Sequence, residues 1–189
     1  YVAGTNLYKN TAYTIQNGKP VMGGTYPDNY NIYLDATNYV LHVKNADIDA
    51  TGKTGISGTS NIVFEGKNSI TASTYGICSD FKSSDLKISG TGSLEVKTIA
   101  GEPAIATAYD TSRSIIISGN DFTVTADTSE TTSYAIKSDK DLTITDGAAV
   151  IAKSNEKRAI NVNGSLTVTG ATLTATSTSN NVPTVQVGG

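Results

Sequence analysis

Six consecutive units between Asn38 and Gly189 follow one pattern, and this repeat constrains the fold more than any other feature of the chain. Each unit has two alternating apolar residues, a Gly, Asn or Asp turn, a second alternating pair, a spacer, and a small residue followed by an aliphatic one. The units begin at Asn38, Asn61, Asp85, Ser114, Asp141 and Ser165, so their spacings are 23, 24, 29, 27 and 24 residues. Self-similarity with a period of roughly 20–50 residues is typical of stacked, solenoid-like folds.

The repeated positions align in three sets, with a turn former after the first. The first pairs are Leu41/Val43, Ile62/Phe64, Leu86/Ile88, Ile115/Ile117, Leu142/Ile144 and Leu166/Val168, and their turn formers are Asn45, Gly66, Gly90, Gly119, Asp146 and Gly170. The second pairs are Ile48/Ala50, Ile70/Ala72, Leu94/Val96, Phe122/Val124, Val150/Ala152 and Leu173/Ala175. The third set is the aliphatic residues Ile56, Ile77, Ile105, Ile136, Ile160 and Val185.

This period-2 alternation predicts three short strands per unit. Stacking the units places every apolar pair on the equivalent pair of the next unit and creates a continuous internal column at the strand spacing of about 4.8 Å. A three-sided, right-handed parallel β-helix of about six to seven coils is the fold that we expect. A β-sandwich also contains many short strands, but it gives no reason for three inward positions to recur six times.

The first 37 residues lack the repeat and hold six of the ten tyrosines. The end of a solenoid needs a cover for its open core and its unpaired strand edges. We therefore expect residues 1–30 to form an N-terminal cap, residues 31–36 to form a partial first rung, and residues 31–189 to form the β-helix. No cover is visible at the other end, where "TVQVGG" still follows the repeat; a further domain or contacts that the sequence does not show are both compatible with it.

Composition excludes several classes of function. Charged residues make up 16% of the chain, the formal net charge is −3, and no basic patch is present, so nucleic acid is not an expected partner. No run of about 18 apolar residues exists, so no transmembrane segment is expected. Abundant Ser, Thr, Asn and Gly with few charges is typical of exported bacterial surface proteins, which predicts an extracellular or cell-surface location.

Four segments carry a resemblance to a known family: "YVLHVKNADIDATGKTGI", "DLKISGTGSLEV", "YAIKSDKDLTITDGA" and "SLTVTGATLTATS". Over residues 12–178 the chain resembles the right-handed β-helix family of bacterial surface carbohydrate-binding domains typified by a clostridial polysaccharide-lyase-like protein. The resemblance implies export, calcium binding and affinity for plant-type polysaccharides, with no firmly assigned enzymatic activity for most members. Acidic residues that often precede the third strand in that family are replaced here by Ser73-Thr74-Tyr75, Glu102-Pro103, Ser133-Tyr134 and Lys157-Arg158.

A calcium site, if the chain has one, is expected at the corner between the third strand of one unit and the first strand of the next. Five carboxylates fall near this corner: Asp80, Asp85, Asp110, Asp139 and Asp141. Calcium takes six to eight oxygen ligands, which such a cluster can help to supply. Aspartate before a strand is also a common turn former that bonds to the nearby backbone, and the missing acidic pair favours weak calcium binding or none.

A ligand-binding surface is predicted along the corner that precedes the third strand. Tyr75 and Tyr134 both lie two residues before an inward isoleucine, Pro103 holds the equivalent place between them, and Arg158 follows. Tyrosine offers an apolar ring face and a polar tip, so this column can stack sugar rings. A packing ladder that closes the corner is the alternative.

The expected function is a non-catalytic, secreted or cell-surface module that binds a polysaccharide or a cell-surface glycan. A structural or adhesive stalk is the second possibility, and a polysaccharide lyase is the third. A lyase needs a metal ion beside a Lys or Arg base, and the sequence shows no lysine next to a cluster of metal ligands. This disfavours the lyase. Asp47 and Asp49 flank Ile48 and face outward, as an acid–base pair or as two solvated carboxylates.

Overall fold

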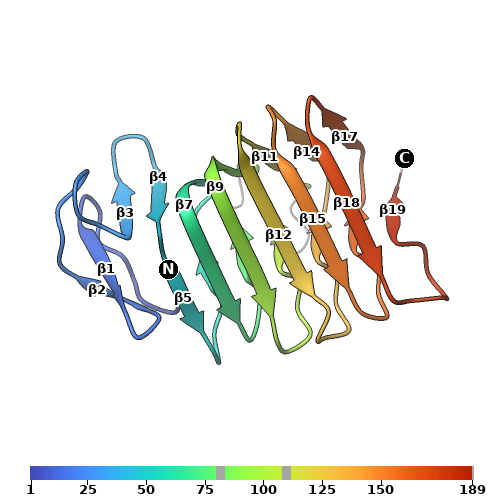
Figure 1. The fold of residues 1–189 in the computed structure, drawn as a ribbon, viewed down its shortest axis with the longest axis horizontal. Helices are drawn as coiled ribbons and strands as arrows, with labels where there is room; N and C mark the ends of the chain where they lie inside the picture. The colour runs from blue at the N-terminus through green and yellow to red at the C-terminus, as the bar shows by residue number, and fades with distance from the viewer. Residues whose placement is uncertain (80–83, 108–111, 189) are drawn as a thin grey trace.

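The computed structural model describes residues 1–79, 84–107 and 112–188, and these form an all-β parallel β-helix with an N-terminal cap (Figure 1). Strands of successive coils lie side by side along one long axis, and no helix occurs in the described residues. Six strands stack on the third face, one for each repeat unit. The predicted fold class is therefore confirmed.

Each coil contributes strands to three faces. The first face stacks β4 (Val40–Lys44), the start of β7 (Asn61–Ala72), the start of β9 (Leu86–Thr98), β11 (Ile115–Ser118), β14 (Leu142–Thr145) and β17 (Leu166–Thr169). The second face stacks β5 (Asp47–Ala50), the ends of β7 and β9, β12 (Phe122–Thr128), β15 (Ala149–Ser154) and β18 (Thr172–Ser177). The third face stacks β6 (Ile56–Ser57), β8 (Ile77–Ser79), β10 (Ile105–Thr107), β13 (Ile136–Ser138), β16 (Ile160–Val162) and β19 (Val185–Val187).

The predicted register is confirmed on the third face and is partly wrong on the other two. The third-face column runs through the six predicted aliphatic residues from Ile56 to Val185. On the first face, however, Ile62 pairs with Ile88 instead of Leu86. On the second face Ile70 pairs with Val96 instead of Leu94, and Val124 pairs with Leu94 and Val150 instead of Val96 and Ala152. Each of these errors is a shift of two residues. Such a shift keeps the same side chains inside, so the apolar pattern by itself does not distinguish the two registers.

All six predicted turn formers have positive φ angles, the conformation that Gly, Asn and Asp tolerate best. Four of them are glycines, and the other two are Asn45 at φ 47° and Asp146 at φ 56°. Gly90 has a second role, because a Cβ atom there would lie 2.0 Å from the carbonyl oxygen of Phe64 in the preceding coil. Gly90 and Gly92 of the third coil pair with Phe64 and Phe122 and leave room for their rings, which stack with centroids 6.3 Å apart.

The core is one continuous column of Ile, Leu, Val, Ala and Phe side chains along the axis of the helix. In the middle coils these side chains are completely buried, as Ile88, Ile117 and Ile144 show. Outward positions carry Thr, Ser, Lys and Asp, as the alternation predicts. Burial of apolar area at about 25 cal/mol per Å² is the main stabilising term of such a fold.

The N-terminal cap covers the edge of all three faces. Its strands are β1 (Ala12–Gln16), β2 (Lys19–Met22) and β3 (Ile32–Asp35), and β3 pairs with the first-face strand β4 in antiparallel fashion. The Asp49 amide of the second face donates to the Gly18 carbonyl at 2.9 Å. On the third face the Ala3 amide donates to the Gly55 carbonyl at 2.7 Å. Within the predicted partial first rung, residues 31–36, β3 does form a strand against the first face, but it runs antiparallel to β4, so the parallel ladder begins at β4.

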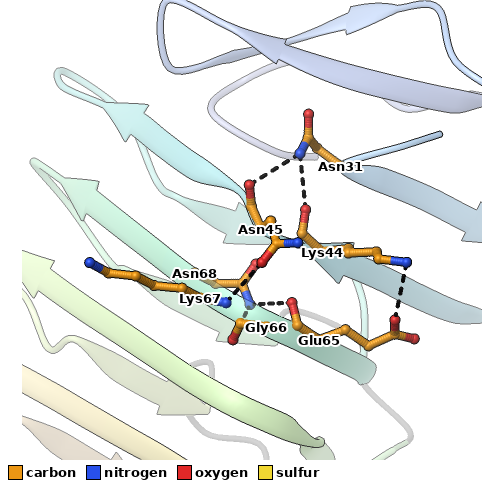
Figure 2. Close-up of polar contacts among 7 residues, drawn as sticks. All are labelled: Asn31, Lys44, Asn45, Glu65, Gly66, Lys67 and Asn68. Carbon is orange, nitrogen blue, oxygen red and sulfur yellow. Dashed lines mark hydrogen bonds and ion pairs between the residues drawn. The ribbon is translucent and has the colours of Figure 1, made fainter.

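Asparagine side chains lock the cap to the first two coils, as Figure 2 shows. The Asn31 side-chain amide donates to the Lys44 carbonyl at 3.0 Å and to the Asn45 carbonyl at 3.1 Å. One coil further, the Asn45 side-chain oxygen accepts from the Lys67 amide at 3.0 Å. Side-chain bonds at these partly buried and exposed turns thus join the cap to the first coil and the first coil to the second.

Residues 1–79, 84–107 and 112–188 contain no helix that is long and apolar enough to cross a membrane.

Candidate functional site

The sequence-predicted column of Tyr75, Tyr134 and Arg158 occupies equivalent positions in successive coils, because Ile77, Ile105, Ile136 and Ile160 pair in register. The three side chains are half-buried, and Pro103 between the two tyrosines is buried. The Nε atom of Arg158 is itself buried. The register thus agrees with the prediction, and ligand binding by this half-buried column stays a prediction.

Two of the predicted calcium ligands bond to backbone amides of the next coil. Asp85 accepts from the Ser114 amide at 2.9 Å, and Asp141 accepts from the Ser165 amide at 2.8 Å. Asp139 lies 3.9 Å from the ammonium of Lys137, and its side chain is 10% exposed. Asp80 and Asp110 lie outside the described residues. In the part of the chain that the structure describes, no group of three or more His, Cys, Asp or Glu side chains is close enough to hold a metal ion.

The outward carboxylates on β5 are engaged in local hydrogen bonds. Asp47 accepts from the Ser69 hydroxyl on β7. Asp49 accepts from the amide and the hydroxyl of Thr51 at 2.9 and 2.6 Å, and these bonds lower the pKa of its carboxyl, the hydroxyl bond most. A general acid needs a raised pKa, so Asp49 fits a solvated turn carboxylate better than a general acid.

A hollow lies at the corner where the cap meets the first coils. Its volume is about 490 Å³, and its lining is Lys9, Leu34, Tyr39, Gly58, Thr59, Ser60 and Ser84. Tyr39 stands in the turn between β3 and β4 and is 68% exposed. The ammonium of Lys9 lies 5.3 Å from the centre of the Tyr39 ring, which favours a fixed ring orientation. We call this hollow the cap groove.

Two further hollows extend the cap groove in opposite directions. One shares Leu34, Gly58 and Thr59 with it and adds Tyr1 and Asn6. The other shares Tyr39, Ser60 and Ser84 with it, and adds Asn38, Asn61, Asp85 and Lys87. The two outer hollows have no lining residue in common. Together the three form an elongated track, apolar around Leu34 and polar around Asn61 and Lys87, with exposed tyrosines and many hydroxyl and amide groups along it.

An aromatic cluster on the outer side of the cap holds β3 against β4. The rings of Tyr26 and Tyr33 stack with centroids 4.0 Å apart, and His42 faces Tyr33 as its cross-strand neighbour. Burial, with smaller effects of Glu65 and Tyr26, raises the pKa of Tyr30 to about 12. The ammonium of Lys44 lies 5.6 Å from the Tyr30 ring centre and 3.7 Å from Glu65. This packing positions the β3–β4 turn that carries Tyr39.

Sequence reasoning missed Tyr39 and Lys9 as candidate site residues. Lys9 lies in the segment that the sequence predicts to be a cap, and Tyr39 lies at the start of the first repeat unit, before its apolar pair. The signal that could have identified the groove is Asn38-Tyr39, an aromatic residue in a polar turn between two apolar stretches. Loops on a rigid scaffold carry binding residues more often than the scaffold does.

Comparisons of the chain with protein-family models, with curated proteins and with solved structures found no significant match.

Proposed function

We propose that this chain is a non-catalytic, secreted or cell-surface module that binds a polysaccharide, and that the cap groove is its binding site. The observation that carries the proposal is the exposed Tyr39 ring, held by Lys9 above an elongated hollow with an apolar floor. The calcium expectation plays no part in this proposal, since the groove is built without a cluster of carboxylates.

The lining suits a sugar more than a lipid or a peptide strand. A sugar ring has one apolar face and a rim of hydroxyl groups, so it needs a flat apolar partner together with hydrogen-bonding groups. Tyr39 supplies the ring face, while Thr59, Ser60 and Asn61 supply donors and acceptors. Ligand sites in general combine an apolar wall with a few placed polar groups.

The elongated shape favours a polymer over a single sugar. Tyr1 lines one outer hollow and Tyr39 lines the middle and the other outer hollow, so ring platforms recur along the track. Each platform contributes about 0.5–1.5 kcal/mol beyond area burial if a sugar ring behaves as other flat partners do. Binding is then weak at each site and increases with the length of the chain that occupies the track.

Affinity electrophoresis against a panel of neutral and acidic plant and bacterial polysaccharides tests the proposal. The decisive variant is Tyr39→Asn, because asparagine tolerates the φ of 53° at this position and removes only the ring. We expect Tyr39→Asn to weaken retention by about two- to tenfold, with an unchanged melting temperature.

The matched aromatic control is the Tyr75→Ala/Tyr134→Ala double variant. It should keep wild-type retention if the cap groove is the site. Loss of retention in the double variant and not in Tyr39→Asn would move the site to the predicted column. A wild-type chain that no polysaccharide retains would support the stalk, and new reducing or unsaturated ends in the gel would support a lyase.

A further inference from the structure

The track changes from apolar to polar along its length. One outer hollow, with a volume of about 290 Å³, has three leucines in its lining, Leu7, Leu34 and Leu41. Leu34 also lines the cap groove, whereas no leucine is found among the described residues that line the opposite outer hollow. That lining carries amide, hydroxyl and charged groups, on Asn38, Asn61, Ser60, Ser84, Asp85 and Lys87. The two ends of the track therefore suit different parts of a ligand.

The leucine end offers more aliphatic surface than an unsubstituted sugar ring uses. The apolar face of a sugar ring is flat and is matched by an aromatic ring such as that of Tyr39. At the leucine end the wall is aliphatic instead, because Leu34 is half-buried there and its cross-strand partner Leu41 is buried. A sugar hydroxyl against such a wall loses its bonds to water without replacement, which costs free energy, whereas a small alkyl group gains from the same contact.

The cap groove places hydrogen-bonding groups beside this aliphatic wall. Ser60 and Ser84 line the groove together with Leu34, and neither serine is buried. Their hydroxyl groups can donate to a carbonyl oxygen. An acyl group combines a carbonyl oxygen with a small alkyl group, so it matches a leucine that stands next to serine hydroxyls. A lipid chain has no group to which these hydroxyls could bond.

A sugar unit on Tyr39 lies within reach of both kinds of group. Tyr39, Leu34 and Ser60 line the same hollow. The ring of Tyr39 is held by Lys9, whose ammonium lies 5.3 Å from the ring centre. A substituent of the sugar that stacks on this ring can therefore contact Leu34 without leaving the cap groove. The polar end of the track remains for the hydroxyl groups of a neighbouring sugar.

We infer, on the basis of the function proposed above, that the ligand is an acylated polysaccharide with acetyl groups on its amines or its hydroxyls, and that the leucine end of the track binds these groups. The acetyl methyl group packs against Leu34, and Ser60 or Ser84 donates a hydrogen bond to the acetyl oxygen. Each methyl group that is removed from water in this way strengthens binding by roughly fourfold.

Two pairs of matched ligands, measured with the full chain, test this inference. An O-acetylated glucomannan and the same polymer after alkaline removal of its acetyl groups are compared by affinity electrophoresis. The hexasaccharide of N-acetylglucosamine from chitin and the hexasaccharide of glucose from cellulose are compared by calorimetry. All of these ligands are neutral, so the charges of the groove do not bias the comparison. We expect the acetylated member of at least one pair to bind more tightly by roughly fourfold. The pair that shows the preference distinguishes acetyl esters from acetamides.

Leu34→Gln is the decisive variant, because glutamine is similar in size to leucine and removes the apolar wall. It should bind both members of each pair with equal affinity. Leu166→Gln is the matched control, since Leu166 is a half-buried leucine of the first face in a coil distant from the track, and it should keep the wild-type preference. Melting temperatures establish that both variants are folded, and the comparison of the matched ligands on the wild type does not depend on either of them.

Equal binding of the acetylated and unacetylated ligands by the wild type would overturn the inference. The cap groove would still be the binding site if Tyr39→Asn weakened the retention of another polysaccharide. A preference for acetyl groups that persists in folded Leu34→Gln would place the acetyl contact elsewhere and would equally overturn it. A wild type that no polysaccharide retains would contradict both the acetyl contact and the proposed function.

Discussion

At the scale of single residues, Asn68 shows how the turns of neighbouring coils are joined. Its side chain is 2% exposed and accepts from the Ala46 amide of the preceding coil at 3.0 Å. Its amide group donates to the Glu65 carbonyl at 3.0 Å (Figure 2). In the following coil the paired residue is Leu94, so the position itself is compatible with an apolar side chain. The contribution of Asn68 at this position is therefore its hydrogen bonds, because an apolar side chain also fits the space.

Replacement of Asn68 by alanine is expected to lower the free energy of unfolding by about 1–3 kcal/mol, since the buried Ala46 amide loses its acceptor. Urea unfolding followed by circular dichroism measures the change. Lys67→Ala, at an exposed neighbouring position, should stay within about 0.5 kcal/mol of the wild type. Equal stability of Asn68→Ala and wild type would show that the turn backbone finds other partners.

Tyr30 gives the fold a dependence on alkaline pH. The pKa of its hydroxyl is raised from 10.0 to about 12, first by burial. The unfolded chain therefore loses this proton at lower pH than the folded chain, and the contribution of Tyr30 to stability is complete below pH 10 and is lost as the pH rises toward about 12. The urea concentration at which half of the protein is unfolded should fall less steeply with rising pH for Tyr30→Phe than for the wild type. Parallel curves for the two proteins would contradict the assignment.

At the scale of elements, the stack of strands is held together by the cap and by the corner between the second and third faces of each coil. Along that corner Thr98, Thr128 and Ser154 form a column, and each hydroxyl donates to a carbonyl in the loop before the third strand at 2.7–3.0 Å. These buried hydroxyl groups fix loops of different length to the same backbone position. Coil length can therefore vary between the second and third strands without disturbing the third-face register.

Removal of the cap is expected to cause aggregation. A chain of residues 37–189 exposes the edges of β4, β5 and β6, which the cap covers in the full chain. Open, flat edges of this kind pair with other molecules. Light scattering at micromolar concentration should show large particles for the shortened chain and none for the full one. A soluble, monomeric shortened chain with the wild-type melting temperature would show that the cap is dispensable.

At the scale of the whole molecule, we expect the fold to be independent of calcium. The carboxylates of Asp85 and Asp141 already accept backbone amides, so a calcium ion would compete with the bonds that join the coils. Calorimetry with calcium should show weak binding or none, and a chelator should shift the melting temperature by less than about 2 °C. Tight binding, or a large loss of stability with the chelator, would place a site among carboxylates that include Asp80 and Asp110.

The sequence determined the fold class, the inward residues, the turn positions and the third-face register. Each of these follows from local chemistry: alternation sets which side chains are buried, and a positive φ requires Gly, Asn or Asp. The third-face column was predictable because Ile77, Ile105 and Ile136 are single aliphatic residues marked by a small residue before them. No alternative alignment of those short segments buries the same side chains.

Only the tertiary structure decided the register of the other two faces, the antiparallel direction of β3 and the location of the cap groove. Ile62 can face Leu86 or Ile88 with equal burial, and the choice depends on the path of the whole coil, including Gly90 beneath Phe64. The groove joins Lys9 to Tyr39 and Ser84, which are distant in the chain and meet because the cap folds back over the first coils. Contacts of this kind depend on chain direction and packing, which a periodic pattern does not encode.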